Sequence, residues 1–279
     1  MASLIPAAAT PRAAALRSLA ADWTLLRTPP ADGAHNMAVD LALLREAQAT
    51  GRATLRLYGW TQPTLSLGRH ERARGRFSPE RLRDEGIDLV RRPTGGRALL
   101  HGPELTYSVT APAGDAPLRW RYDCINALLA DALRALGVQA EPHVAARHAR
   151  PGDAVCFSEP SSGEITVQGA KLVASAQLEE PGAFLQHGSL LLRDAQPTIA
   201  RLLGNPAVAD ATTRATALDQ LLPQAASFDA VADALGAALV AAVGEEHVTK
   251  RHTLESLSAE ATLAPLVEHF RDPAWTWSR

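Results

Sequence analysis

Apolar residues recur at helical spacing in several parts of the chain. Residues 37–49 predict a helix that Asn36 would cap and Gly51 would end. Residues 123–136 carry apolar side chains three and four positions apart, which predicts a second amphipathic helix. From about residue 197 onward the pattern is mainly helical.

Short apolar runs bounded by turn residues predict seven strands. They are residues 53–60, 64–67, 87–92, 105–111, 164–168, 171–178 and 183–192. The first two would pair across a turn at Gln62-Pro63, and a Gly169-Ala170 turn would make a hairpin of the fifth and sixth. Ser78 followed by Pro79 predicts the start of a short helix. Because helices and hairpins are intermixed, an α+β fold is favoured over a doubly wound sheet.

The size and composition indicate one ordinary globular domain. The chain has 279 residues, 46% apolar side chains and a net charge of −2. We expect residues 1–22 to form an extension without regular structure and residues 23–279 to form a single domain with a helical C-terminal part. The small-apolar run over 234–243 is too short to span a bilayer. The balanced charge gives no nucleic-acid or membrane footprint, so neither is expected as a partner.

The chain has two cysteines, in different surroundings. Two cysteines make no disulfide framework, so we expect a reducing, cytoplasmic location. Cys124 lies in the predicted helix 123–136, where a small buried apolar role is expected. Cys156 lies in the turn-rich polar segment 151–163, which is compatible with an exposed nucleophile or with a cysteine that packs locally.

Lysine is rare: Lys171 and Lys250 are two among 28 basic residues. A lysine kept in an arginine-rich chain suggests a position where an ammonium is required. Strand alternation places Lys171 on the same face as Ser175 and Gln177. An ammonium beside a thiol lowers the pKa of the thiol, so Lys171 is a candidate partner for a cysteine nucleophile. The alternative is an ordinary solvated lysine at a strand end.

A glycine-rich loop, RRPTGGR over residues 91–97, lies between two predicted strands. Its spacing fits neither a Walker A loop nor a dinucleotide fingerprint. Three arginines around two glycines suit an anion-recognition loop, while a hairpin turn with solvated arginines is equally consistent. His101 and His187 follow this loop and a later turn. Each is a structural histidine or a ligand contact, and their spacing does not predict a metal site.

A local basic cluster follows the second predicted strand. Its members are Arg69, Arg72, Arg74, Arg76, Arg81 and Arg83. Acidic residues are interleaved, so the cluster is either a solvated surface or a docking site for an acidic carrier protein.

Several motifs together resemble one known superfamily. They are Asn36–Asp40, Tyr58–Trp60, Leu65–Arg69, RRPTGGRALLH over 91–101, Glu104–Ser108, Cys156-Phe157, GAKLVASAQ over 169–177 and QHGSL over 186–190. In this order and spacing they resemble the biotin/lipoate protein ligase superfamily, most closely its LipM-type octanoyltransferases. The resemblance implies a central mixed or antiparallel sheet flanked by helices, with an acyl tunnel beside the glycine-rich loop.

The resemblance also implies roles for individual residues. Cys156 matches the acyl-thioester nucleophile, and Lys171 matches the lysine that lowers the pKa of this thiol and contacts the acyl carbonyl. Lipoate ligases keep this lysine but lack the cysteine. We expect substrate contacts from Arg92, Thr94, Gly95, Gly96, Arg97, His101, Ser175, Ala176, Gln177, His187 and Gly188.

The function that the resemblance implies is ping-pong octanoyl transfer in lipoate biosynthesis. The donor is octanoyl-acyl carrier protein, and the acceptor is a lysine of a lipoyl carrier domain, such as the glycine-cleavage H protein. No cofactor is expected, because a thioester already carries the activated acyl group. The alternatives are an amidotransferase that takes octanoyl from H protein, an ATP- and magnesium-dependent lipoate ligase, and a non-catalytic binder of carrier domains.

Overall fold

The computed structural model describes residues 11–143, 156–157, 160, 162–203, 214–224, 226–254 and 262–279. Its strands are β1 (Trp23–Arg27), β2 (Ala53–Tyr58), β3 (Thr64–Leu67), β4 (Asp88–Arg91), β5 (Leu99–His101), β6 (Glu104–Pro112), β7 (Glu141–Pro142), β8 (Ile165–Val167), β9 (Ala170–Glu180), β10 (Ala183–Leu191) and β11 (Val248–Arg251). Its helices are α1 (Pro11–Leu19), α2 (Gly33–Thr50), α3 (Pro79–Asp84), α4 (Leu118–Ala135), α5 (Pro197–Leu203), α7 (Leu218–Leu221), α8 (Phe228–Val243), η2 (Glu245–His247), α10 (Leu263–Arg271) and α11 (Pro273–Thr276).

Eight strands form a mixed sheet in the order β11-β1-β2-β6-β10-β9-β8-β7, and β4-β3-β5 form a small second sheet. β11, β1 and β2 run parallel, whereas β6, β8, β9 and β10 pair antiparallel. The mixed sheet and the α+β class predicted from the sequence are therefore confirmed. The predicted pairing of residues 53–60 with 64–67 is wrong, because β2 and β3 belong to different sheets.

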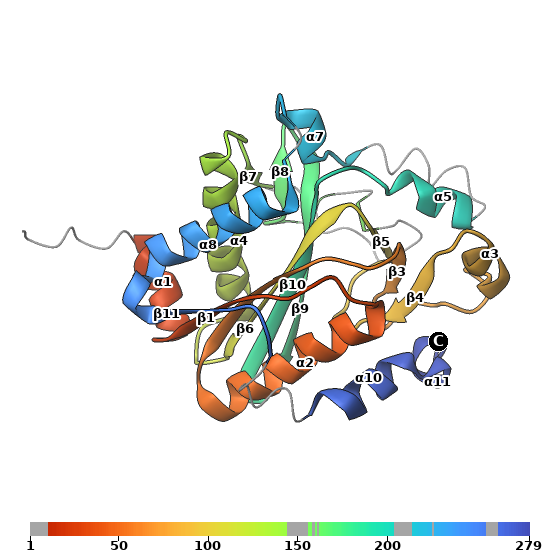
Figure 1. The fold of residues 1–279 in the computed structure, drawn as a ribbon, viewed down its shortest axis with the longest axis horizontal. Helices are drawn as coiled ribbons and strands as arrows, with labels where there is room; N and C mark the ends of the chain where they lie inside the picture. Colours follow the sequence, from red (N-terminus) through yellow and green to blue (C-terminus); the bar gives the residue numbers. More distant parts are fainter. Residues whose placement is uncertain are drawn as a thin grey trace, which may run out of the picture.

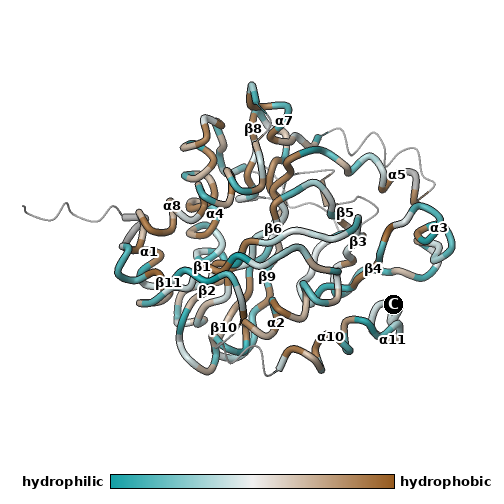
Figure 2. Tube along the Cα trace, viewed as in Figure 1, coloured by the Kyte–Doolittle hydropathy of each residue, from teal (hydrophilic) through white to brown (hydrophobic). Residues whose placement is uncertain are grey.

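Helices cover both faces of the large sheet (Figure 1). α1, α4 and α8 bury their apolar sides against β1, β2, β6 and β9, where the main core lies. On the opposite side α2 packs on β6 and β10, and α10 packs on α2. Figure 2 shows hydrophobic and hydrophilic residues interleaved along the tube. None of the helices in the described parts of the chain has the length and apolar character needed to cross a membrane.

One of the two predicted caps of helix α2 is correct and the other is not. Gly51 ends the helix as predicted, in the left-handed conformation with φ of 71°. The N-cap is Asp32, whose side chain accepts a hydrogen bond from the backbone N–H of His35. Asn36 is not the cap. It lies inside the helix, fully buried, and its amide donates to the carbonyl of Gly59 at 3.1 Å.

The N-terminal expectation also needs correction. Residues 1–10 lie outside the described residues, but residues 11–19 form helix α1 rather than an unstructured extension. Leu16 and Leu19 are buried in the main core, where α1 packs against α8. The apolar side of this helix therefore belongs to the domain.

Candidate active site

A cavity of about 650 Å³ lies where β8 stops pairing with β9. Its volume falls within the roughly 300–1,000 Å³ usual for small-molecule sites. Eleven of the predicted site residues line it: Arg92, Gly96, Arg97, His101, Cys156, Lys171, Ser175, Ala176, Gln177, His187 and Gly188. Thr94 and Gly95 do not line it. Among the described residues, β8 pairs with β9 only as far as Val173. Beyond this point residues of both faces of β9 line the cavity.

A β-bulge changes the face on which Lys171 lies. Thr166 pairs with Lys171 and Ile165 with Val173, so Leu172 is an extra residue in β9. Leu172 and Val173 are both buried in the main core. The predicted alternation of Lys171 with Ser175 and Gln177 is therefore wrong, since the bulge places Lys171 on the other face of the strand.

The hairpin turn is shifted by one residue from the prediction. Gln168 and Gly169 both have positive φ, 51° and 80°, which is the backbone of a type I′ turn. The turn thus lies at 168–169, and Ala170 is already the first residue of β9.

Cys156 and Lys171 lie side by side in the cavity. Lys171 Nζ is 3.9 Å from Cys156 Sγ and donates a hydrogen bond to the carbonyl oxygen of Cys156 at 2.7 Å. The backbone N–H of Cys156 donates to the carbonyl of Ala98, and the next residue, Phe157, is fully buried. Cys156 is thus anchored on both sides, although residues 151–155, 158, 159 and 161 lie outside the described residues.

Glu164 joins this pair and was not predicted. Its Oε2 lies 2.7 Å from Lys171 Nζ, and both side chains are nearly buried, with exposed fractions of 6% and 2%. The predicted hairpin did not indicate this contact, because a turn at 169–170 pairs 168 with 171 and sets Glu164 opposite Ser175. Glu164 immediately precedes β8, the strand that faces Lys171.

The other cysteine lies in different surroundings. Cys124 is on α4, away from the described cavity lining, and burial raises the pKa of its thiol to about 11. The sequence predicted a small buried apolar residue in a helix. Cys124 does lie in the helix, but it is only partly buried.

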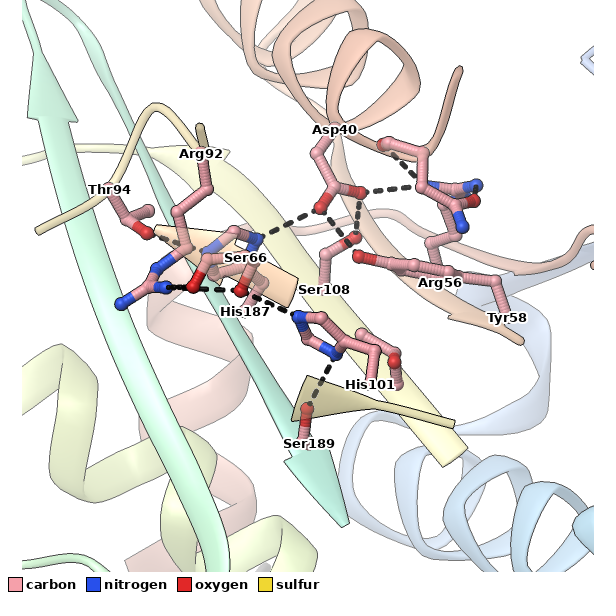
Figure 3. A network of polar contacts seen from close by, with 12 residues as sticks. Asp40, Arg56, Tyr58, Ser66, Arg92, Thr94, His101, Ser108, His187 and Ser189 are labelled. Carbon is pink, nitrogen blue, oxygen red and sulfur yellow. Dashed lines mark hydrogen bonds and ion pairs between the residues drawn. The ribbon is translucent and has the colours of Figure 1, made fainter. Parts of the chain in front are cut away.

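A buried polar network supports the cavity from the side of α2 (Figure 3). The Asp40 carboxylate accepts hydrogen bonds from Arg56, Tyr58, Ser108 and His187 at 2.7–3.1 Å. Burial alone would raise the pKa of Asp40, but the hydrogen bond from His187 and the charge of Arg56 together outweigh it and lower the pKa. Asp40 is therefore a charged anchor below the sheet.

The network continues from His187 to the glycine-rich loop. Burial lowers the pKa of His187 below its usual value, so the imidazole is neutral near pH 7. Its Nδ1–H donates to Asp40, which leaves Nε2 to accept from Thr94 Oγ1 at 2.7 Å. Thr94 is fully buried, so it holds the loop in place from below rather than contacting a substrate.

His101 also links the polar groups around the cavity to the glycine-rich loop, through Ser66 and Arg92. Its Nδ1 lies 2.7 Å from Glu104 Oε1 and its Nε2 lies 2.8 Å from Ser66 Oγ. Ser66 Oγ in turn accepts from Arg92, and the His101 ring stacks on Trp60 with centroids 3.9 Å apart. In the parts of the chain that the structure describes, no three His, Cys, Asp or Glu side chains cluster to hold a metal ion.

Two arginines of the glycine-rich loop bind the protein itself. Arg91 donates to the carbonyls of Gly68 and Thr276, and Arg92 donates to those of Gly95 and Arg97. The interpretation of all three arginines as anion ligands is therefore wrong for Arg91, which is fully buried and shapes the loop. Arg92 shapes the loop as well, but it also lines the cavity, and its predicted substrate contact stays a prediction. Arg97 lines the cavity.

Close backbone packing and a positive φ explain three glycines in and beside the site. A Cβ at Gly68 would collide with the carbonyl oxygen of Gly96, and Gly96 has a positive φ of 96°. A Cβ at Gly188 would collide with the carbonyl oxygen of Ala174 and with the ring of Tyr107. Neither place admits a side chain.

A polar cluster lies on the α4 side of the cavity. Tyr107 and Ser175 hydroxyls are 2.7 Å apart, and Gln186 links Tyr107 to Gln177 at 2.9 and 3.0 Å. Burial raises the pKa of Tyr107 to about 12, so it remains a neutral donor. Tyr122 from α4 also lines the cavity and was not predicted.

Comparison with known proteins identifies the family of this chain. The model of the lipoyl protein ligase A/B catalytic domain matches residues 32–240. The chain belongs to this family. An octanoyltransferase LipM of Kyrpidia tusciae is 38% identical over 229 residues, covering 74% of this chain and 84% of that protein. An octanoyltransferase LipM of Moorella thermoacetica is 37% identical over 206 residues, covering 72% and 73%.

Solved structures of the family share the fold. Lipoate-protein ligase A bound with ATP matches with a TM-score of 0.77 at 21% identity, covering 92% of this chain and 98% of that one. The bipartite lipoate protein ligase of Thermoplasma acidophilum matches with a TM-score of 0.74 at 22% identity, covering 92% and 96%. The lipoyl ligase fold expected from the sequence motifs is confirmed.

Proposed function

We propose that this protein transfers an octanoyl group from acyl carrier protein to a lysine of a lipoyl carrier domain through a thioester at Cys156. The observation that carries the proposal is the contact between Cys156 and Lys171, with Sγ and Nζ 3.9 Å apart in a cavity of about 650 Å³. The relatives named octanoyltransferase LipM support the acyl group and the reaction type.

In the first half-reaction the Cys156 thiolate attacks the carbonyl carbon of the octanoyl thioester. A new carbon–sulfur bond forms to Cys156, the bond to the carrier sulfur breaks, and the carrier thiolate leaves and takes up a proton. Lys171 is placed to stabilise the negative charge with its ammonium group. The small side chains Ala174 and Ala176 leave room for the alkyl chain along β9.

In the second half-reaction the amine of the acceptor lysine attacks the thioester on Cys156. The carbon–nitrogen bond forms, the carbon–sulfur bond breaks, and the amine proton passes to the departing sulfur. Thioester to amide is downhill, so we propose that no nucleotide or metal takes part. Both cysteines are free thiols, which supports a reducing compartment such as the cytoplasm.

The deciding experiment is intact mass spectrometry after incubation with octanoyl-acyl carrier protein in the absence of nucleotide. We expect one added octanoyl group that hydroxylamine removes, on the parent and on Cys124→Ala but not on Cys156→Ala. Acylation that persists in Cys156→Ala contradicts the proposal. Activation of free octanoate by ATP in place of the thioester would establish the ligase alternative.

A parallel incubation separates the two transferase alternatives. Octanoyl-H protein replaces octanoyl-acyl carrier protein as the donor under otherwise equal conditions. Faster acylation of Cys156 from acyl carrier protein supports the proposed donor. Faster acylation from H protein would identify an amidotransferase.

A further inference from the structure

Lys171 is held by two strong acceptors beside the thiol. Its Nζ lies 2.7 Å from Glu164 Oε2, 2.7 Å from the carbonyl oxygen of Cys156 and 3.9 Å from Cys156 Sγ. An ammonium has three N–H donors and no acceptor. The carboxylate and the carbonyl take two of them, which directs the third toward the sulfur side of the cavity.

The charge of this lysine needs compensation. Its side chain is 2% exposed, and a buried ammonium without a counter-charge loses its proton readily. The cavity wall is otherwise basic, with Arg92, Arg97 and Arg119. Among the cavity-lining residues that the structure describes, Glu164 is the only carboxylate.

We propose that Glu164 is a positioning residue that keeps Lys171 charged and directed at Cys156. Without the carboxylate, the buried ammonium would have no counter-charge, and losing its proton to become a neutral amine would be favoured. A neutral amine cannot stabilise the thiolate or the oxyanion. This inference rests on the proposed function for its catalytic meaning, but the charge of Lys171 is measurable without any acyl donor.

Other groups also face this lysine and its partners. Burial lowers the pKa of Arg92, and the neighbouring Cys156 and Glu71 oppose this lowering. Tyr122 has a raised pKa, chiefly through burial and also through the charge of Glu164. Phe157 presents its ring 5.2 Å from Lys171 Nζ. None of these three groups supplies a negative charge in contact with the ammonium, whereas Glu164 does.

The two lysines of the chain make a direct test possible. Lysine labelled with ¹³C at Cε gives two NMR signals, and the exposed Lys250 is an internal reference. In Glu164→Gln we expect Lys171 to lose its proton at a pH roughly two units or more below that of the parent, which its Cε signal reports. The Lys250 signal should not move. A matched control is Glu180→Gln, which removes one charge at the far end of β9.

Alkylation of Cys156 by iodoacetamide supplies the second readout. At pH 7 we expect Glu164→Gln to be slower than the parent by roughly tenfold, as expected for one unit of thiol pKa. Lys171→Met should be slowed to a similar extent. The double variant should be no slower than Lys171→Met alone, because Glu164 acts through the lysine.

Three results would overturn the inference. They are an unchanged Lys171 titration in Glu164→Gln, faster alkylation of Cys156 in that variant, or a parent Lys171 that is already neutral at pH 7. The last needs no variant, so the inference stays testable if Glu164→Gln does not fold. Glu164→Asp keeps the carboxylate and should therefore leave the Lys171 titration closer to that of the parent than Glu164→Gln does. A parent that never accepts octanoyl on Cys156 would contradict the proposed function while leaving the lysine titration intact.

Discussion

Thr94 and His187 lie 93 residues apart in the chain and share a hydrogen bond of 2.7 Å between Oγ1 and Nε2. The bond ties the glycine-rich loop to strand β10 and through Asp40 to helix α2. It sets the position of the loop that closes one side of the cavity.

Thr94→Val tests this connection with almost no change in volume. The substitution leaves the buried Nε2 of His187 without a donor, which costs about 1–3 kcal/mol of unfolding free energy. We expect that loss in urea denaturation, together with a lower kcat for octanoyl transfer. Thr110→Val is the matched control, because Thr110 Oγ1 is buried without a hydrogen-bond partner. A loss of equal size at both positions would contradict the role of the Thr94 hydroxyl.

The lowered pKa of His187 predicts sensitivity to mild acid. The unfolded histidine titrates near 6.5 and the folded one below it, so below pH 6.5 the unfolded state binds more protons. Stability therefore falls as the pH decreases from 6.5, by up to about 1.4 kcal/mol per pH unit for one proton. The lowered pKa of Asp40 adds a further loss below its unfolded value of 3.8.

Thermal unfolding from pH 8 to pH 5 measures this effect. We expect the Tm of His187→Gln to be lower than that of the parent at pH 8 but to change less between pH 6.5 and 5. The exposed His252→Gln should follow the parent curve. Parallel curves for the parent and His187→Gln would show that His187 is not the group responsible.

The two thiols should react at very different rates. Burial raises the pKa of Cys124 to about 11, so only about a thousandth of it is thiolate at pH 8. We expect brief iodoacetamide treatment to modify Cys156 and spare Cys124, as judged by peptide mass mapping. Cys156→Ser should then take up almost no label. Preferential labelling of Cys124 would be inconsistent with the described burial.

Lys171→Arg separates charge from position. The lysine pocket is closed, with Nζ 2.7 Å from both the Glu164 carboxylate and the Cys156 carbonyl. A planar guanidinium keeps the charge but displaces it, and a shift of about 1 Å can cost on the order of a hundredfold in rate. We expect a loss of that order in octanoyl transfer with the fold retained. Lys250→Arg, at the exposed lysine, should transfer at the parent rate.

If Lys171→Arg transfers octanoyl as fast as the parent, the ammonium has no special role. Circular dichroism of the variant confirms that any loss arises in the site and not from unfolding.

Docking of an acidic carrier is best tested at Arg69 and Arg72. Arg74 donates to the carbonyl of Trp277 and Arg76 pairs with Glu71 at 2.9 Å, so changing these two would disturb the local structure. Arg69 and Arg72 are exposed, and the backbone N–H of Arg69 bonds to Thr94 in the glycine-rich loop. Charge reversal at both should raise KM for the carrier-bound donor and leave a small octanoyl thioester unaffected.

Arg45→Glu, on an exposed face of α2, is the control for a general change in net charge. Added salt should raise KM of the parent for the carrier-bound donor toward the value of the double variant, because salt screens exposed charges. Equal effects of the double reversal on both donors would argue against docking at this surface.

Local sequence signals determined much of the secondary structure. Ser78 caps α3 as predicted. Its hydroxyl accepts a hydrogen bond from the backbone N–H of Arg81, three residues later, so the cap involves only neighbouring residues. Gly51 ends α2 for the same kind of local reason. The motifs around Cys156 and Lys171 likewise indicated the two groups that the fold brings together.

The arrangement of the site was decided by tertiary structure. The extra residue Leu172 turns Lys171 to the other face of β9, and alternation along one strand cannot reveal a bulge that depends on the register with β8. Glu164 meets Lys171 only because that register is formed. Thr94 meets His187 because β10 pairs between β6 and β9, which no local pattern specifies. Helix caps and turns involve neighbouring residues and can be read along the chain, whereas buried charge pairs require distant segments to fold together.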